Sequence, residues 1–197
     1  MFATKYEIKL FLDSPRAPCI DSLVPVFHRI IREGSLGELL IDVINYAHIQ
    51  NGPGLLLIGH ASDYAFSLSG ERPGLLVRRK RPPPSHEPYL PGTLRSLLHL
   101  AHLLEEEPTL HDWRFDTREI VACINDRLWT RTRPDASHQL RDTLGGLLTS
   151  IYDGPPELHS HGQPRERLSV RALAPSALSL DRLLARLDSQ HLHHRAA

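Results

Sequence analysis

A histidine, an aspartate and a tyrosine lie close together within residues 38–76, and their types could support acid–base chemistry. His60 is a candidate general base, because imidazole titrates near neutral pH, with Asp63 as its orienting carboxylate and Tyr64 as a donor. Side chains three residues apart on a regular strand point to opposite faces, so His60 and Asp63 meet only across a β-bulge, for which Gly59 is suited. The catalytic candidates are therefore His60, Asp63 and Tyr64.

The same region also contains candidate ligand-binding residues, which are His28, Asp42, His48 and His60. The expected hairpin places His48 and His60 on one face of the sheet but roughly 13 Å apart along the strand, at about 3.3 Å per residue. One metal ion cannot bridge that distance, so a metal would need one of these histidines together with His28, Asp42 or Asp63. Hydrogen-bonded structural histidines are the simpler interpretation.

Two further groups of histidines occur near the C-terminal end. His159 and His161 share a face if their segment is a strand, which is adequate geometry for a weak metal contact. His191, His193 and His194 form a looser group. Exposed histidines capture divalent metals without an attached function, so we expect no metal site and no cofactor.

The densest basic run is formed by Arg78, Arg79, Lys80 and Arg81. Such a run could clamp a phosphate or an acidic partner segment, or it could be a solvated strand end whose charge blocks edge pairing. Lys and Arg total 23 and Asp and Glu total 23, so the chain has no net charge to attract nucleic acid. No aromatic residues interleave the run as stacking platforms, and we expect no nucleic-acid binding.

Several other classes of protein are disfavoured by the sequence. It contains no P-loop, no G-x-G-x-x-G and no G-x-S-x-G elbow. Cys19 and Cys123 lack a local histidine and are too few for a disulfide framework, so we expect reduced thiols. The sequence has no signal-peptide pattern and no apolar run near the roughly 20 residues that span a bilayer, which predicts a cytoplasmic protein without membrane insertion.

Hydrophobic periodicity predicts the elements that position these residues. Alternating or β-branched segments predict strands at 6–12, 38–49, 55–68, 75–79, 113–115, 119–128, 157–161 and 167–173. Helical spacing predicts helices near 22–34, 92–107 and 137–152, and a last one after Pro175. Helices separated from antiparallel hairpins are typical of an α+β fold, with amphipathic helices packed on one face of the sheet.

Two domain arrangements are consistent with this pattern. Residues 1–174 form one compact α+β domain, or two related halves, 1–81 and 92–174, joined by a proline-rich linker at 82–91. A C-terminal helix follows at 175–190, and a flexible histidine-containing tail at 191–197. The helix carries an apolar stripe of Leu180, Leu183, Leu184 and Leu187. Such stripes usually pack into a core or a dimer, yet this one is the best sequence cue for a partner.

Several short motifs carry a resemblance to a protein family. They are Val26-Phe27-His28-Arg29, Ile41-Asp42-Val43, the Gly-Pro-Gly and Leu-Ile-Gly-His elements within 48–64, Arg72-Pro73-Gly74-Leu75-Leu76, Asn125-Asp126-Arg127-Leu128 and Pro164-Arg165-Glu166-Arg167. Over about residues 5–173 the chain resembles an uncharacterised family of small bacterial proteins. The resemblance implies a bacterial cytoplasmic protein and no particular activity. The chain departs from the family after Leu128 and in the C-terminal extension, where we expect a specialised partner contact.

These observations lead to two functional hypotheses. The first is a non-enzymatic binding, assembly or regulatory protein that contacts another protein or a second copy of itself. The alternative is a metal-dependent or histidine-based enzyme, or a ligand sensor, centred on the 38–76 hairpin. The two differ in whether the candidate side chains converge in one pocket.

Overall fold

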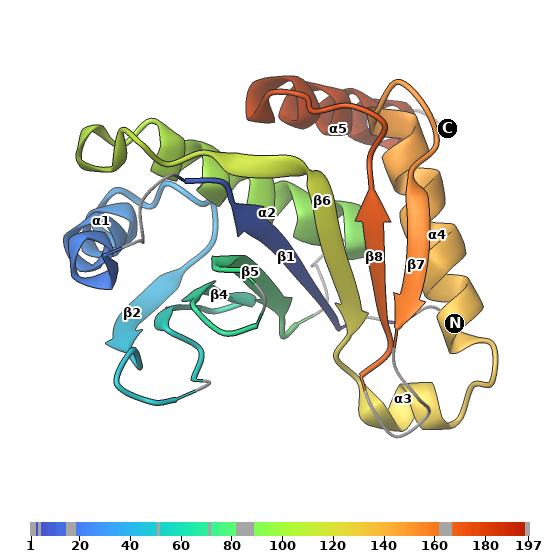
Figure 1. Cartoon of the computed structure of the whole chain (residues 1–197), viewed down its shortest axis with the longest axis horizontal. Helices are drawn as coiled ribbons and strands as arrows, with labels where there is room; N and C mark the ends of the chain where they lie inside the picture. The colour runs from blue at the N-terminus through green and yellow to red at the C-terminus, as the bar shows by residue number, and fades with distance from the viewer. Residues whose placement is uncertain are drawn as a thin grey trace.

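The computed structural model describes residues 3, 5–14, 19–50, 52–70, 72–81, 89–161 and 167–195. Over these ranges the chain forms one eight-stranded sheet with the strand order β2-β3-β4-β5-β1-β6-β8-β7 (Figure 1). All neighbouring strands in it are antiparallel. The helices are separate from the strand pairs, so the predicted α+β fold is confirmed.

The elements follow one another in an order that alternates helices with groups of strands. The strands are β1 (Tyr6–Leu12), β2 (Leu40–Asn45), β3 (Leu55–Gly59), β4 (Ser62–Ser67), β5 (Gly74–Arg79), β6 (Phe115–Ile124), β7 (Glu157–His161) and β8 (Ser169–Leu173). The helices are α1 (Ile20–Glu33), α2 (Tyr89–Glu105), the short 3₁₀ helix η1 (Pro108–Leu110), α3 (Arg127–Arg131), α4 (Ala136–Ile151) and α5 (Leu180–Arg195).

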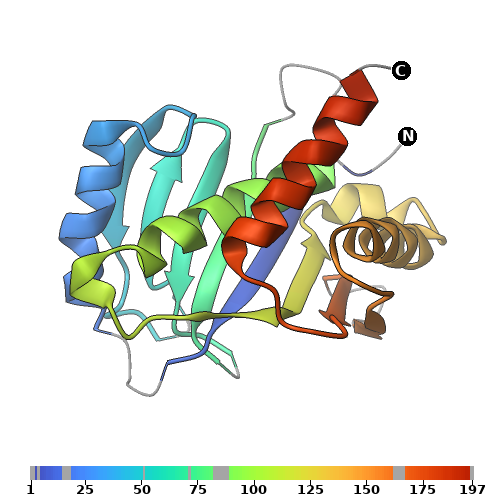
Figure 2. The ribbon, with the colours of Figure 1, turned by 90° about the horizontal axis from the view of Figure 1, so that it is seen from above.

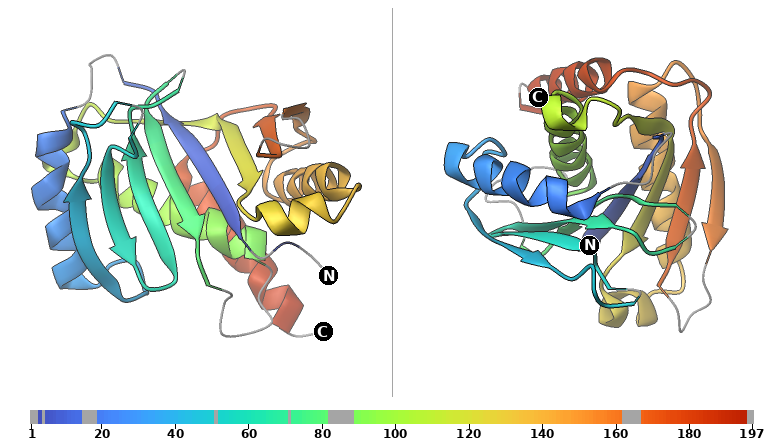
Figure 3. Two further views of the ribbon diagram at one scale, coloured as in Figure 1. Left: turned by 90° about the horizontal axis from the view of Figure 1, so that it is seen from below. Right: turned by 60° about the vertical axis from the view of Figure 1, so that its left-hand side comes forward.

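The four long helices lie on one face of the sheet (Figure 2). Helix α1 packs on β2 and β3, α2 on β1 and β5, α4 on β7 and β8, and α5 lies against α2. Strand alternation explains this arrangement, because side chains of one parity face the helices. In β1 these are Tyr6, Ile8, Leu10 and Leu12, all part of the main hydrophobic cluster. The other face of the sheet, which we call the open face, is covered by none of the described helices (Figure 3, left).

Strand β1 lies in the middle of the sheet and joins its two parts. It pairs with β5 on one side and with β6 on the other, so Glu7 lies opposite both Arg78 and Cys123. The predicted halves 1–81 and 92–174 therefore contribute to one continuous sheet. Most of the predicted linker, residues 82–88, lies outside the described residues, and residues 89–91 belong to α2 instead.

The segment 55–68 is not one strand, as predicted, but the two strands β3 and β4. They are separated by a tight turn at His60 and Ala61, where Glu38 Oε2 accepts hydrogen bonds from the backbone N–H groups of Ala61 (2.8 Å) and Ser62 (3.0 Å). A Cβ atom at Gly59 would lie 2.5 Å from the Ser62 carbonyl oxygen, so the close approach requires glycine.

The register of the first hairpin also differs from the prediction. Val43 lies opposite Leu57 and Asn45 opposite Leu55, so β2 ends before His48. A bulge between Leu40 and Asp42 adds a register shift near the start of β2. Residues 46–50 instead form a turn at the end of the hairpin, which is why His48 is not on a strand.

Two expectations for the second half need correction. The strands predicted at 113–115 and 119–128 are one strand, β6, with a register shift opposite Leu10 and Phe11, and the residues after it turn into α3. Asp126 begins α3, because its carboxylate accepts the Trp129 N–H at 3.0 Å. Helix α5 extends to Arg195, so residues 191–195 continue the helix that was predicted to end at 190.

Candidate functional site on the open face of the sheet

Long charged side chains cover the central strand on the open face, where the described structure places no helix. The Lys9 ammonium and the Arg72 guanidinium lie 5.1 Å and 5.0 Å from the centre of the Phe11 ring. Phe11 is consequently buried, although it points away from the helices. The open face therefore differs from a simple solvated sheet face, since ion-paired side chains shape its surface.

Glu7 is the most buried charged group on this face. Its side chain is 7% exposed and lies between two guanidinium groups. Glu7 Oε2 accepts a hydrogen bond from Arg78 Nε at 2.7 Å, and Glu7 Oε1 accepts one from Arg167 Nη1 at 2.7 Å. A buried carboxylate is tolerated only with such partners, and the three side chains together carry one net positive charge.

A second ion pair lies beside this triad of Glu7, Arg78 and Arg167. Asp63 of β4 is opposite Arg78 of β5 in the sheet, and its carboxylate is 2.6 Å from the Lys80 ammonium. This aspartate is therefore neutralised by its own lysine. The triad keeps its excess positive charge.

A cleft of about 380 Å³ opens next to the triad. Its floor is formed by the side chains of Leu56, Ala65 and Leu76 on three adjacent strands. The remaining lining consists of Glu7, Asp63, Arg78 and Arg167, the loop residues Gly52 and Pro53, and Ser67 and Ser69. The cleft thus combines a charged group, an apolar floor and two hydroxyl groups.

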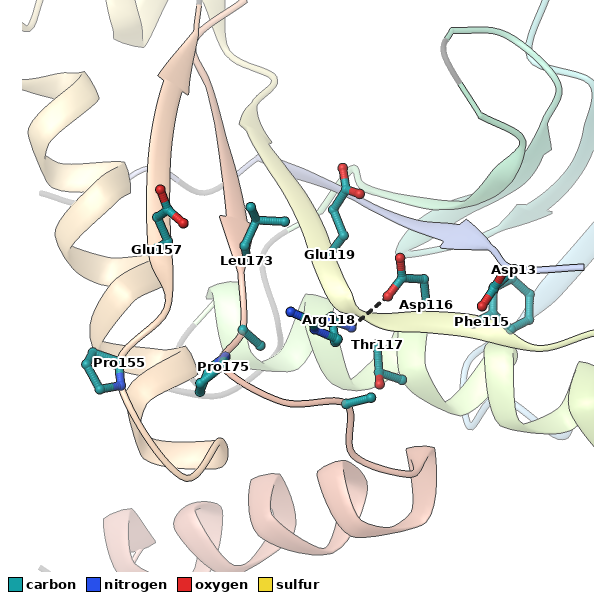
Figure 4. Close-up of a pocket in the computed structure, with 12 residues that line it drawn as sticks. Asp13, Phe115, Asp116, Thr117, Arg118, Glu119, Pro155, Glu157, Leu173 and Pro175 are labelled. Carbon is teal, nitrogen blue, oxygen red and sulfur yellow. Dashed lines mark hydrogen bonds between the residues drawn. The ribbon is translucent and has the colours of Figure 1, made fainter.

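A larger and shallower hollow of about 700 Å³ lies at the ends of β6, β7 and β8 (Figure 4). Asp13, Asp116, Glu119 and Glu157 bring four carboxylates to its lining. Arg72 Nη1 lies 3.2 Å from Asp116 Oδ2 and 3.0 Å from Glu119 Oε2, so two of these carboxylates share one cation. Among the described residues no group of three or more His, Cys, Asp or Glu could hold a metal ion.

The predicted catalytic residues do not come together. His60 is exposed in the turn after β3, with Nε2 3.1 Å from Arg81 Nη1. Asp63 lies on the open face, whereas Tyr64 is fully buried on the helix side and donates to Glu38 Oε1 at 2.5 Å. Burial raises the pKa of the Tyr64 phenol, and Glu38 raises it further, so this hydroxyl group stays protonated and acts as a structural donor. The bulge that would have joined His60 to Asp63 is replaced by a turn.

The predicted ligand-binding residues are also dispersed. His28 is exposed on α1 and His48 is exposed in the β2–β3 turn. Asp42 is exposed on β2, where its Oδ1 accepts the backbone N–H of Val43 at 2.8 Å. Neither His28, Asp42, His48 nor His60 lines the cleft. The expectation that His48 and His60 share a sheet face is wrong, because both lie in turns.

The basic run divides between different partners and does not form one anion clamp. Arg78 pairs with Glu7, and Lys80 pairs with Asp63. Arg79 Nε donates to the carbonyl oxygen of Arg81 at 2.6 Å. Strand alternation explains this division, and only Arg78 of the four residues lines the cleft.

The leucine stripe of α5 is part of the protein's own core. Leu180, Leu183 and Leu187 are at most 3% exposed, and Leu184 packs partly buried against the same cluster. Because α5 lies against α2, these side chains are not available to a partner in this structure, which corrects their expected role.

The histidines of β7 remain on the surface. His159 and His161 are exposed, and His159 Nε2 is 3.0 Å from Glu157 Oε1. The side chains of His191, His193 and His194 lie outside what the structure describes.

No described helix is long and apolar enough to cross a membrane.

Sequence reasoning missed the residues that shape the cleft, Glu7 and Arg167 above all. The alternation of Tyr6–Leu12 places Glu7 on a polar face, but 160 residues separate it from Arg167. No protein-family model matches the chain, and no curated protein or solved structure does. The bacterial family resemblance and the cytoplasmic location therefore stay predictions.

Proposed function

We propose that this protein is a non-enzymatic binding protein and that the cleft on the open face is its binding site. The observation that carries this proposal is the buried Glu7 carboxylate held between Arg78 and Arg167 at the end of an apolar floor. Concave sites that combine apolar lining with a few fixed polar groups are typical of ligand recognition.

The state of the charged groups favours binding over catalysis. Each carboxylate in the cleft is in an ion pair, Glu7 with two arginines and Asp63 with Lys80. Such pairs hold side chains in place, whereas a general base needs an accessible lone pair beside the substrate. Residues 38–76 supply most of the cleft lining. The proposal therefore keeps one part of the alternative hypothesis, a ligand sensor in this region, and drops its histidine chemistry.

A second candidate function is contact between two copies of this chain, and it rests on a different surface. Leu39 and Ile41 next to and within edge strand β2 are 68% and 58% exposed. Neighbouring exposed apolar residues are a feature of protein contacts. Native mass spectrometry would test this candidate, because Leu39→Ser with Ile41→Ser should convert a dimer to a monomer. A monomeric unmodified protein would contradict it.

The binding proposal can be tested by NMR with isotope-labelled protein. We would titrate neutral, cationic and anionic aromatic fragments and follow the backbone amides. Perturbations should cluster at Leu56, Ala65 and Leu76 on the cleft floor. No perturbation at millimolar concentrations, or perturbation confined to the helix side of the sheet, would contradict the proposal.

A further inference from the structure

We infer that the cleft binds a small monocarboxylate with an apolar body, whose carboxylate group is held by Arg78 and Arg167. This inference rests on the proposed binding function and adds the chemical class of the ligand. Two properties of the cleft lead to it, the unused donors of the triad and the apolar floor beside them.

The two arginines keep hydrogen-bond donors for a ligand. A guanidinium group has five N–H donors. Arg78 directs Nε and Nη2 to Glu7, and Arg167 directs Nη1 to it. Among the described residues Glu7 is their sole ion-pair partner, and their side chains remain 39% and 42% exposed. The other N–H groups of both arginines have no ion-pair partner among the described residues and can bind an acceptor in the cleft.

The charge of the site favours a singly charged anion. Two guanidinium groups and one carboxylate leave one positive charge, and Asp63 is already balanced by Lys80. A carboxylate restores neutrality. A phosphate group brings a charge of about −1.5 to −2 and would leave an excess of negative charge beside Glu7 and Asp63. Carboxylates also match the planar guanidinium fork.

The size and lining of the cleft define the rest of the ligand. The volume of about 380 Å³ lies near the lower end of the range for small-molecule sites. Leu56 and Leu76 are half-buried there with Ala65 between them, so they offer an apolar surface to an alkyl or aryl group. Ser67 and Ser69, with their hydroxyl oxygens 2.7 Å apart, mark another polar part of the lining.

Glu7 acts as a positioning residue in this arrangement. Its buried carboxylate binds one side of each guanidinium group and so fixes the distance between them. Fixed donors lose less conformational entropy when a ligand binds, which increases affinity. The competing explanation is that both arginines serve only to neutralise Glu7, and the experiment below separates the two.

Isothermal titration calorimetry of the full chain with three matched probes tests the inference. The probes are 4-phenylbutyrate, its uncharged amide and 3-phenylpropyl phosphate, which share a phenyl ring and three methylene groups. The carboxylate should bind at least roughly tenfold more tightly than the amide, because a charge-assisted hydrogen bond contributes that much or more. It should also bind more tightly than 3-phenylpropyl phosphate.

Variants of the triad then locate the bound carboxylate. Arg167→Gln should weaken 4-phenylbutyrate binding by roughly tenfold or more, and Arg167→Lys by less, because lysine keeps the charge and loses the fork. Arg167 is preferred to Arg78 for this test, because in Arg167→Gln the buried Glu7 keeps its ion pair with Arg78. Arg118→Gln removes the same charge from an exposed arginine in the other hollow and should leave affinity unchanged.

Each outcome of these titrations decides a separate point. Three results would overturn the inference while leaving the binding function in place. They are binding of the amide as tightly as the acid, tighter binding of 3-phenylpropyl phosphate, and loss of binding in Arg118→Gln instead of Arg167→Gln. Absence of binding by any probe, together with no NMR perturbation of the cleft, would overturn both. An unchanged amide spectrum of each variant outside the cleft verifies its fold.

Discussion

Glu38 holds the β3–β4 turn by accepting hydrogen bonds from three donors. Its Oε2 binds the N–H groups of Ala61 and Ser62, and its Oε1 binds the Tyr64 hydroxyl group. The turn and the buried phenol therefore depend on one carboxylate, which reaches them from 23 residues earlier in the chain. Its role is structural, in contrast to the catalytic role predicted for the neighbouring Tyr64.

Removing these contacts should lower stability by measurable amounts. Tyr64→Phe deletes one hydrogen bond and should reduce the free energy of unfolding by about 1–2 kcal/mol. Glu38→Ala leaves several donors without an acceptor and should reduce it by about 2–4 kcal/mol. Urea unfolding measures both. Glu33→Ala is the control, because Glu33 is exposed and its ion pair with Arg29 is long, at 4.0 Å. A similar loss in all three variants would contradict the assigned role.

Cys123 should resist thiol reagents. It lies opposite Glu7 on the open face, and burial, assisted by the Glu7 charge, raises its pKa to about 12. The thiolate is the reactive form, so almost none is present at pH 8. Reaction with a disulfide reagent should modify one thiol per native chain, the exposed Cys19, and two after denaturation. Two rapid modifications in the native protein would refute this, and Cys19→Ser should abolish the native reaction.

At the residue scale the sequence predicted the alternation of polar and apolar residues along β1, but not where the chain leaves a strand. The alternation argument for His60 and Asp63 assumed that both lie on one strand, but His60 lies in the turn before β4 and Asp63 lies within β4. The break at His60 was not predicted, because apolar residues lie on both sides of Gly59 and His60 and residues 55–68 resemble one strand. It depends on Glu38, a contact that no local pattern encodes. Arg167 was missed for the same reason, since its partner Glu7 is distant in sequence.

At the scale of elements, α5 stabilises the fold through the leucines that were expected to meet a partner. Leu183→Ala should lower the free energy of unfolding by about 2–5 kcal/mol, because the side chain is fully buried and leaves a cavity. The partly buried Leu184 should cost less when truncated. Urea unfolding measures the stability of both variants, and native mass spectrometry measures their oligomeric state. A change in oligomeric state with unchanged stability would instead support the partner role.

The α2–α5 contact should also make stability depend on pH. Partial burial, and then the charges of Arg95 and His102, lower the pKa of His99, with Asp188 acting in the opposite direction. His102 in turn lies 3.4 Å from Asp181 of α5. In the unfolded chain His99 has the ordinary histidine pKa near 6.5, which is above its pKa in the folded protein. As the pH falls below about 6.5 the unfolded chain therefore binds a proton before the folded protein does, and stability falls.

His99→Gln provides the test of this pH dependence. The variant should lose part of the decrease in stability between pH 7 and the lowered folded pKa, while its stability at pH 8 stays close to that of the parent. Urea unfolding across this range measures both. His138→Gln, at an exposed position on α4, is the matched control and should leave the slope unchanged. A steeper slope in His99→Gln would show that the sign is wrong.

The elements themselves were largely predictable, and their junctions were not. Helices α1, α2 and α4 begin and end within a few residues of the predicted bounds, because each presents an apolar stripe to the sheet. Strand β6 was divided in two by the polar residues near Asp116, whose carboxylate is bound by Arg72. A distant cation thus makes a polar segment acceptable within a strand, and local composition does not reveal it.

At the scale of the whole molecule, β1 makes the two predicted halves depend on one another. A fragment of residues 1–81 lacks β6, and a fragment of residues 89–197 lacks β1, so each exposes an apolar edge of the sheet. We expect each fragment alone to be largely unfolded by circular dichroism. The mixed fragments should regain β-sheet signal, because the same pairings form between chains. A cooperative unfolding transition in either isolated fragment would contradict this expectation.

The central place of β1 also has a consequence during synthesis. Its residues leave the ribosome before those of β6, which is complete only at Ile124. At translation rates of about 5–20 residues per second, the apolar Tyr6–Leu12 segment waits roughly 5–20 s for its second neighbour. Until β6 emerges, a nascent chain therefore carries β1 with one unpaired edge, and that edge is where a chaperone would bind it.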